Sequence, residues 1–197
     1  MNPFIVFEGV DGSGKTTIGK KLAQEIGGIY MCTPSEGLRP ARSYIDSSPS
    51  SEAKLLFYLS SVVDASQRIS LSRETRPVIC DRYIWSTLIP HSTYHGVELG
   101  FLEHSLEFIT QNLEVPTHTV LLTVSEDEQL RRLGLRDENK RTASDSFCLN
   151  RTLRQRVHES YKSVAKREGW IVIDTNHKNI ESVMDEVFQL TVGGVLV

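Results

Sequence analysis

The chain has 197 residues, of which 39% are hydrophobic, so it can bury a substantial core within one α/β unit. Its formal net charge of −3 excludes a strong positive field over the whole surface, and we therefore expect no nucleic acid polymer as a partner. Three widely spaced cysteines and an N-terminus without a signal-peptide pattern favour a reducing, cytoplasmic location. We read no apolar run of the length of a membrane span, and so expect no membrane partner.

The first predicted strand, residues 3–8, leads into a glycine-rich segment at residues 9–16 that reads Gly-Val-Asp-Gly-Ser-Gly-Lys-Thr. The segment fits the pattern GxxxxGK followed by Ser or Thr, and a helical pattern over residues 14–26 comes next. Strand, glycine-rich loop and helix in this order are typical of a P-loop, whose backbone N–H groups cradle phosphates. A chance glycine-rich turn is the alternative, and the flanking elements disfavour it.

Each part of this loop has an expected chemical role. The triphosphate-binding residues would be Gly9, Asp11, Gly12, Ser13, Gly14, Lys15, Thr16 and Thr17. Lys15 is expected to reach the β- and γ-phosphates and to act in catalysis, whereas the Thr16 hydroxyl would ligate Mg²⁺.

Apolar runs and helical patterns alternate along the rest of the chain. Four further strands are predicted at residues 28–33, 77–81, 118–124 and 170–174. Further helices are predicted at residues 51–74, 98–113, 126–136, 145–168 and 178–191, with Ser50 or Ser51 as the N-cap of the first. The strands are continuously apolar, which indicates a parallel sheet buried on both faces. We predict one α/β domain over residues 1–197, a three-layer P-loop NTPase sandwich with a five-stranded parallel sheet and helices on both faces.

The third predicted strand ends in Asp81, followed by Arg82 and Tyr83. An apolar strand that ends in Asp beside a P-loop has the form of a Walker B element, and we expect Asp81 to bind Mg²⁺ and to serve catalysis. A turn or helix cap is the alternative role for this carboxylate. The Arg82 guanidinium would then grip a second phosphate group in the same crevice.

A basic segment at residues 131–145 has no strand pattern and is predicted to form a short lid. Its positive charges would lie over the triphosphate and neutralise the transferring phosphoryl group. An ordinary solvated helix end is the alternative for each of these residues.

The chain resembles thymidylate kinases over nearly its whole length. The resemblance rests on Phe-Glu-Gly-Val-Asp-Gly-Ser-Gly-Lys-Thr-Thr at residues 7–17, on Leu-Leu-Phe at residues 55–57, and on Asp-Arg-Tyr at residues 81–83 with Ser86. Residues 147–161 and 172–174 also follow the family pattern.

The resemblance implies an ATP- and Mg²⁺-dependent nucleoside monophosphate kinase with an acceptor such as dTMP, and a homodimer. By matching position, Asp11 would contact the acceptor sugar, Phe57 would stack on its base, and Arg82 would hold its phosphate. Ser86 would belong to the same site. Gly12 occupies the position of a P-loop arginine in one branch, so the sequence is similar to the branch with lid arginines. There, Arg136 would be catalytic, and Arg132 and Arg141 would contact ATP.

Several positions that would read the acceptor depart from the family pattern. Ser61 stands where an arginine usually reads the thymine carbonyl, and Pro90 and His91 replace other acceptor-contacting residues. The segment at residues 32–34 lacks the phosphate-binding arginine that the family usually has there, and Arg42 or Arg39 would take over its role. His91 and Arg42 are accordingly candidate substrate-binding residues.

Two other functions remain open from the sequence. A P-loop kinase for a nucleoside or another small hydroxylated metabolite would need a general base, for which Glu36 and Asp11 are the candidates. A nucleotide-dependent switch is the second, but the chain has no guanine-reading Asn-Lys-x-Asp motif, and a switch would have no use for a lid of arginines.

Overall fold

The computed structural model describes residues 1–134 and 150–193. Five strands form one sheet: β1 (Phe4–Glu8), β2 (Ile29–Cys32), β3 (Val78–Asp81), β4 (His118–Thr123) and β5 (Ile171–Asp174). Their order is β2-β3-β1-β4-β5, and every neighbouring pair is parallel. All five predicted strands are therefore confirmed, each to within one residue at either end.

Helices connect the strands. They are α1 (Lys15–Glu25), α2 (Arg39–Ser47), α3 (Ser51–Ser72), α4 (Trp85–His95), α5 (Leu99–Ser105), α6 (Glu107–Thr110), α7 (Glu126–Gly134), α9 (Arg151–Glu168) and α10 (Ile180–Thr191), with a 3-10 turn, η1 (Glu36–Leu38). Ser50 is the N-cap of α3, and its hydroxyl accepts a hydrogen bond from the Ala53 N–H at 3.1 Å, as predicted.

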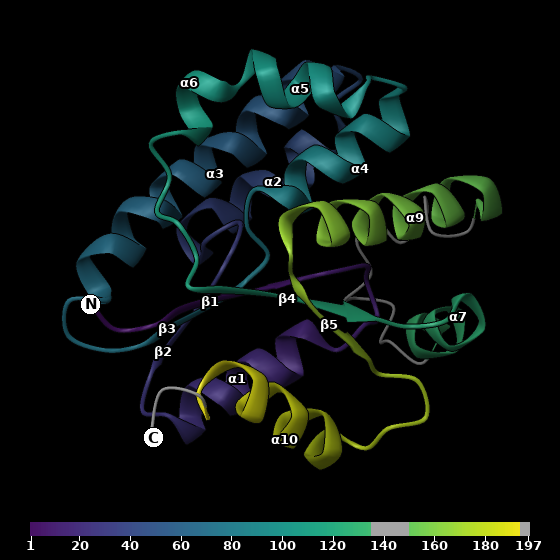
Figure 1. The fold of residues 1–197 in the computed structure, drawn as a ribbon. Helices are drawn as coiled ribbons and strands as arrows, with labels where there is room; N and C mark the ends of the chain where they lie inside the picture. Colours follow the sequence, from purple (N-terminus) through teal and green to yellow (C-terminus); the bar gives the residue numbers. More distant parts are fainter. Residues whose placement is uncertain (135–149, 194–197) are drawn as a thin grey trace.

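The helices cover both faces of the sheet. In Figure 1, α1 and α10 lie against one face, whereas α3, α4 and α9 lie against the other. Side chains of β1 alternate between the two layers: Ile5 and Phe7 pack with the residues of α1 and α10, and Phe4 and Val6 pack with those of α3. The central strands β1 and β3 are thus buried on both faces, and the predicted three-layer α/β sandwich is confirmed.

Two helices differ from the sequence-based prediction. The polar α2 was missed because none of its residues is buried, although a proline in the first turn is typical of a helix start. The second, α4, contains Pro90, whose missing N–H normally argues against a helix. Leu88 and Ile89 are almost fully buried between α3, α5 and α9, and this burial offsets the lost hydrogen bond.

The predicted helix over residues 98–113 is divided into α5 and α6, with a break at Leu106. The ends of two other predicted helices, at residues 135–136 and 145–149, lie outside the described residues. Within residues 1–134 and 150–193, no helix has both the length and the apolar character that crossing a membrane requires.

Candidate active site

The P-loop connects the end of β1 to the start of α1. Gly9 has a φ of 134°, and a Cβ at this position would lie 2.4 Å from the carbonyl oxygen of Leu122 on the neighbouring strand. Gly14, with a φ of 99°, directly precedes α1. A left-handed backbone favours glycine, and an approach as close as that of Gly9 to the neighbouring strand requires it. The predicted strand–loop–helix arrangement is therefore confirmed, and it directs the free N–H groups of α1 at the loop.

The side chain of Lys15 is folded back onto this loop. Its ammonium group donates a 2.7 Å hydrogen bond to the Val10 carbonyl and lies 3.5 Å from the Ser13 hydroxyl. Burial and, to a smaller extent, the nearby Arg82 guanidinium lower the pKa of Lys15 from its ordinary value to about 8, against the raising effect of the Asp11 carboxylate. A buried ammonium group that forms no ion pair with any described residue is well suited to bind phosphate oxygens.

Thr16 and Asp81, the two predicted Mg²⁺ ligands, are in contact. The Thr16 hydroxyl donates to Asp81 Oδ2 at 2.5 Å, and the Tyr30 hydroxyl donates to the same oxygen at 3.0 Å. The other carboxylate oxygen, Oδ1, is buried and has no hydrogen-bond partner among the described residues. Asp81 therefore lies at the end of β3, in contact with the P-loop helix, and its Walker B role stays a prediction.

Arg82 follows Asp81 with a φ of 73°, a left-handed conformation that is uncommon for residues other than glycine and often accompanies functional sites. This backbone turn directs its guanidinium across the sheet to the P-loop, where Nη2 pairs with the Asp11 carboxylate. Its Nη1 donates to the Ser86 hydroxyl at 3.4 Å. Burial alone would lower the pKa of Arg82, but the carboxylates of Asp11 and Asp81 outweigh it and raise the pKa.

A buried carboxylate, Glu8, holds Ser86, the residue whose hydroxyl contacts Arg82. One oxygen accepts hydrogen bonds from the backbone N–H groups of Tyr83 at 3.0 Å and Ser86 at 3.3 Å, at the start of α4. The other accepts from the Ser86 hydroxyl at 2.5 Å. Burial raises the pKa of Glu8, although the bonds from Ser86 and Tyr83 oppose the change. Glu8 thus fixes the first turn of α4 and the hydroxyl that contacts Arg82.

Two cavities meet at the carboxyl ends of the strands. The P-loop cavity is lined by the P-loop and α1 together with residues of α7 and of the segment after β5. Its lining includes the predicted residues Asp11, Gly12, Ser13, Gly14, Lys15, Thr16, Thr17, Arg82 and Arg132. The helix-side cavity lies among α2, α3, α4 and α9, and its lining includes Gly9, Asp11, Arg42, Arg82, Ser86 and His91. Only Asp11 and Arg82, of all these residues, line both cavities.

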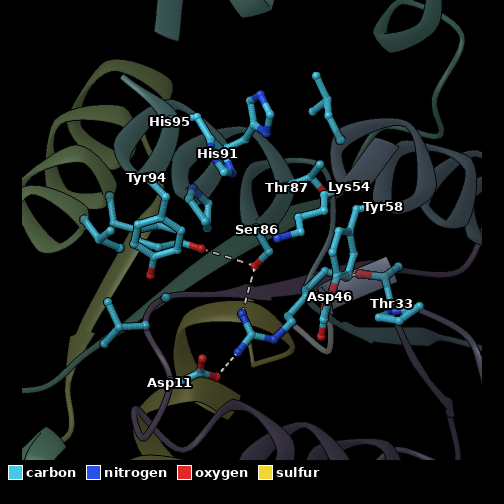
Figure 2. A pocket seen from close by; sticks show the side chains of 18 of the residues that line it. Asp11, Thr33, Asp46, Lys54, Tyr58, Ser86, Thr87, His91, Tyr94 and His95 are labelled. Atoms are coloured by element: carbon cyan, nitrogen blue, oxygen red, sulfur yellow. Dashed lines mark hydrogen bonds and ion pairs between the residues drawn. The ribbon is translucent and has the colours of Figure 1, made fainter. Parts of the chain in front are cut away.

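The aromatic wall of the helix-side cavity differs from our expectation. Phe57, the expected base platform, does not line the cavity, whereas the adjacent Tyr58 does (Figure 2). Lys54, Leu55 and Tyr58 share one face of α3 by their spacing of three and four residues, and Phe57 lies about 100° around the helix from Tyr58. The Phe57 ring packs edge-on against Tyr58, with 5.3 Å between the ring centroids. The ring that lines this cavity is therefore that of Tyr58, and stacking of Phe57 on an acceptor base stays a prediction.

Arg42 contributes to this wall from α2. Its Nε lies 3.4 Å from Asp46 Oδ2, and its guanidinium lies 6.0 Å from the centre of the Tyr58 ring. The Tyr58 hydroxyl donates to Asp46 Oδ1 at 2.6 Å. This network fixes the plane of the Tyr58 ring at the cavity surface.

His91 faces the same cavity from α4, and its ring centroid lies 4.8 Å from that of His95. Burial lowers the pKa of His91, and the neighbouring His95 adds to the effect. The imidazole of His91 is therefore neutral at pH 7 and can both donate and accept a hydrogen bond. Ser61, in contrast, is fully buried, and its hydroxyl donates to the Tyr58 carbonyl at 2.7 Å, so it cannot contact a ligand.

Of the basic residues expected over the triphosphate, Arg132 is described and is tied to the P-loop. It donates to the Gly12 carbonyl at 3.1 Å and to the Thr175 carbonyl at 2.7 Å, and it pairs with Glu128 at 2.8 Å. Arg136 and Arg141 lie outside the described residues, as does the predicted lid beyond residue 134.

Sequence reasoning missed several residues of this region. Gln129 is almost fully buried, and its amide nitrogen donates to the Asp11 carbonyl at 2.9 Å while its amide oxygen lies 2.8 Å from His158 Nε2. Thr175 donates to the Ser13 carbonyl at 3.3 Å and lies just after β5, where the carboxyl-end rule for parallel sheets would have found it. Tyr161 shares a 3.2 Å hydrogen bond with Ser86, and no local pattern distinguishes it from a core residue.

These features define the class of the protein. A P-loop phosphotransferase needs a phosphate-binding loop with a lysine, a carboxylate beside the loop's threonine, and a second cavity next to the loop. This chain has all three, with Lys15, with Asp81 beside Thr16, and with the helix-side cavity. The sequence model of the family "thymidylate kinase" matches residues 7–187, and the chain belongs to the thymidylate kinase family. The family consists of phosphotransferases, in agreement with the class and with the resemblance drawn from the motifs.

Relatives agree over nearly the whole chain. A protein of Methanococcus aeolicus described as a probable thymidylate kinase is 31% identical over 198 aligned positions, which cover 96% of this chain and 95% of that protein. A probable thymidylate kinase of Methanocaldococcus jannaschii is 29% identical over 94% of both chains.

Solved structures share the fold. The thymidylate kinase of Candida albicans superposes with a TM-score of 0.76 at 19% identity, over 96% of this chain and 90% of that one. The Ehrlichia chaffeensis thymidylate kinase gives a TM-score of 0.68 at 24% identity, over 96% and 97%. At these identities the likeness concerns the fold alone.

Proposed function

We propose that the chain transfers the γ-phosphoryl group of ATP to the phosphate of dTMP. The observation that carries this proposal is the position of Asp11 and Arg82, which line both the P-loop cavity and the helix-side cavity. A donor triphosphate in the first cavity and an acceptor in the second would bring their phosphates together at Arg82. The two archaeal relatives are described as probable thymidylate kinases, and we take dTMP as the acceptor from them.

A phosphate acceptor removes the need for a general base, because a phosphate monoester with a second pKa of about 6 is already anionic at neutral pH. The work of this chain is then to align two anions and to reduce the repulsion between them. Lys15 would move from the Val10 carbonyl to the β- and γ-phosphate oxygens, and Arg82 would exchange part of its contact with Asp11 for the acceptor phosphate. Glu8 and Ser86 would hold Arg82 in place during this exchange.

The donor set around Asp81 fits Mg²⁺. The buried Oδ1 of Asp81 has no hydrogen-bond partner among the described residues, and the Thr16 hydroxyl lies on the same carboxylate. One carboxylate and one hydroxyl leave several octahedral positions for water and phosphate oxygens, as Mg²⁺ prefers in nucleotide sites. When bound, Mg²⁺ would neutralise charge on the β- and γ-phosphates.

A hydroxylated metabolite is a weaker acceptor candidate. The side chain of Glu36, a possible base for it, is 87% exposed and pairs with Arg39 at 3.8 Å. Glu36 does not line the helix-side cavity, and the Asp11 carboxylate already pairs with Arg82. Neither carboxylate is available to accept a hydroxyl proton.

We also propose that the chain forms a homodimer, which the family resemblance supports. We propose a cytoplasmic location as well, which the odd number of cysteines supports. Sedimentation equilibrium of the purified chain tests the dimer, and a monomer at micromolar concentration would contradict it.

An acceptor-panel assay tests the activity itself. ADP release from Mg·ATP would be coupled to an indicator reaction, with each common ribo- and deoxynucleoside monophosphate as the acceptor. We expect dTMP to give the highest kcat/KM, and a Lys15→Met variant to lose transfer to all of them. Turnover of no nucleoside monophosphate, or turnover of a nucleoside in preference to its monophosphate, would overturn the proposal.

A further inference from the structure

A buried amide on α7, that of Gln129, connects the P-loop to α9. The side chain is 1% exposed, and its nitrogen donates to the Asp11 carbonyl at 2.9 Å. Its oxygen lies 2.8 Å from Nε2 of His158, at the point where α9 passes beside α7 (Figure 1). A buried amide with a partner at each end is held in one orientation.

The Asp11 carbonyl decides which way round this amide lies. A carbonyl oxygen can only accept hydrogen bonds, so the nitrogen of the Gln129 amide faces it and the oxygen faces His158. His158 therefore donates from Nε2. Burial lowers the pKa of His158, so at pH 7 its imidazole is neutral and carries its proton on Nε2. His158 thus keeps the donor of Gln129 directed at the P-loop.

The bond from Gln129 also sets the direction of the Gly12 N–H. The peptide bond between Asp11 and Gly12 is trans, and the C=O and N–H of a trans peptide point in opposite directions. The Gly12 N–H therefore points away from the Gln129 amide, and it has no hydrogen-bond partner within residues 1–134 and 150–193. Gly12 lines the P-loop cavity, whereas Gln129 lines the helix-side cavity. This N–H is available to a phosphate oxygen.

Gly12 itself gives little resistance to rotation of this peptide group. Its φ is 86°, and glycine adopts the opposite sign about as readily. A rotation of the peptide group by about 180° would replace the N–H with the Asp11 carbonyl oxygen, which repels phosphate. The loop therefore needs a contact from outside to keep the N–H in place, and the hydrogen bond from Gln129 is such a contact.

We infer that Gln129 is a positioning residue, which holds the peptide group between Asp11 and Gly12 so that the Gly12 N–H faces the triphosphate. The inference rests on the proposed function, from which it takes ATP as the ligand of the P-loop cavity. Gln129 acts through the loop and does not line that cavity. Because the loop is ordered before ATP arrives, ATP binding does not bear the free-energy cost of ordering it.

The variant Gln129→Met tests the inference, because it keeps the length of the side chain and removes its donor. Isothermal titration calorimetry would measure the Kd for Mg·ATP and the Kd for dTMP, each nucleotide added alone so that no transfer occurs. His158→Phe, which removes the group that orients the amide, is the second variant. Gln24→Met, the same change at an exposed position of α1, is the matched control.

We expect Gln129→Met to raise the Kd for Mg·ATP by about tenfold and to change the Kd for dTMP by less than about threefold. His158→Phe should raise the Kd for Mg·ATP by about threefold. The double variant should bind Mg·ATP like Gln129→Met alone, because both changes act through one hydrogen bond. Gln24→Met should match the wild type.

The amide proton of Gly12 gives a spectroscopic readout that lost packing alone would not move. In a spectrum of the chain labelled with ¹⁵N, this proton should shift downfield when Mg·ATP binds to the wild type, since a hydrogen bond to a charged oxygen deshields it. In Gln129→Met at saturating Mg·ATP, we expect the shift to be largely lost.

An unchanged Kd for Mg·ATP in Gln129→Met would overturn the inference, as would a full downfield shift of the Gly12 proton in that variant. A larger effect on dTMP than on Mg·ATP would also overturn it, because Gln129 would then be an acceptor contact in the helix-side cavity. If Gln129→Met did not fold, an unchanged Kd for Mg·ATP in His158→Phe would have the same consequence.

Failure of the proposed function has a different signature. In that case the wild-type chain would bind Mg·ATP but phosphorylate no nucleoside monophosphate, and the loss of Mg·ATP affinity in Gln129→Met would still support the inference. A wild-type chain that bound no Mg·ATP would overturn both.

Discussion

The Asp11 carboxylate and the Arg82 guanidinium form an ion pair at the junction of the two cavities. Asp11 belongs to the P-loop, and Arg82 follows the Walker B strand with a left-handed backbone, so the pair joins the two motifs on which phosphate binding depends. In the proposed function, an acceptor phosphate bound to Arg82 would share the guanidinium with Asp11. The pair therefore holds the guanidinium in position before any acceptor arrives.

Replacement of Arg82 by lysine should impair acceptor binding more than ATP binding. A lysine ammonium cannot contact Asp11, Ser86 and a phosphate with the fixed fork of donors that arginine provides. We expect the KM for dTMP to rise by about tenfold or more and the KM for ATP to change by less than about threefold. Initial-rate kinetics with each substrate varied in turn will measure both. The exposed Arg76→Lys serves as the control, and an unchanged dTMP KM would contradict the assignment.

The variant Asp81→Asn should uncouple the site from Mg²⁺. It replaces a carboxylate whose Oδ1 has no partner among residues 1–134 and 150–193 with a neutral amide that binds divalent cations weakly. The Mg²⁺ concentration for half-maximal rate should rise at least about tenfold, and kcat at saturating Mg²⁺ should fall by about a hundredfold. Titration of activity with Mg²⁺ at fixed ATP will measure this. Asp185→Asn, on the exposed surface of α10, should behave as the wild type. A normal Mg²⁺ dependence of Asp81→Asn would show that other groups hold the ion.

The sheet and the donor site could be predicted because local patterns encode them. The P-loop and the end of β3 are short motifs in which each residue type has a chemical reason, and the contact between Thr16 and Asp81 follows from the parallel order of β1 and β3. The central strands β1 and β3 were recognised because burial on both faces leaves a continuous apolar run.

The acceptor side could not be predicted to the same depth. Phe57 and Tyr58 are adjacent aromatic residues on α3, and only the rotation of the helix decides which of them lines the cavity. The sequence predicts Glu8 only as part of a strand. Its hydrogen bonds form where β1 lies beside the start of α4, and this helix was not predicted because it contains Pro90. Contacts between residues distant in sequence, such as Gln129 with Asp11, leave no local periodicity.

Tyr58 and Phe57 provide a matched pair for the aromatic wall. Tyr58→Ala removes a ring that faces the cavity, and we expect it to raise the KM for dTMP by about tenfold, the effect of one lost stacking contact. Phe57→Ala removes a ring of similar size on the same helix that does not line the cavity, and its dTMP KM should change by less than about threefold. Thermal unfolding of both variants separates lost binding from lost stability. A larger KM effect of Phe57→Ala than of Tyr58→Ala would show that Phe57, and not Tyr58, contacts the acceptor.

Lys15 should give the reaction a distinctive pH dependence. Burial and Arg82 lower the pKa of its ammonium group to about 8, so in the free protein the side chain is charged below this pH and neutral above it. ATP needs the charged form, and kcat/KM for ATP should be level below pH 8 and fall by about tenfold per pH unit above it. Bound phosphates raise the pKa again, so kcat should stay level to a higher pH than kcat/KM. Measurement of kcat and kcat/KM between pH 6 and pH 10 with saturating dTMP tests this. The variant Lys15→Met should lose most of the activity, and its remaining kcat/KM should no longer fall above pH 8. A kcat/KM profile that is flat to pH 10 would show that the ammonium of the free protein is not the group that ATP selects.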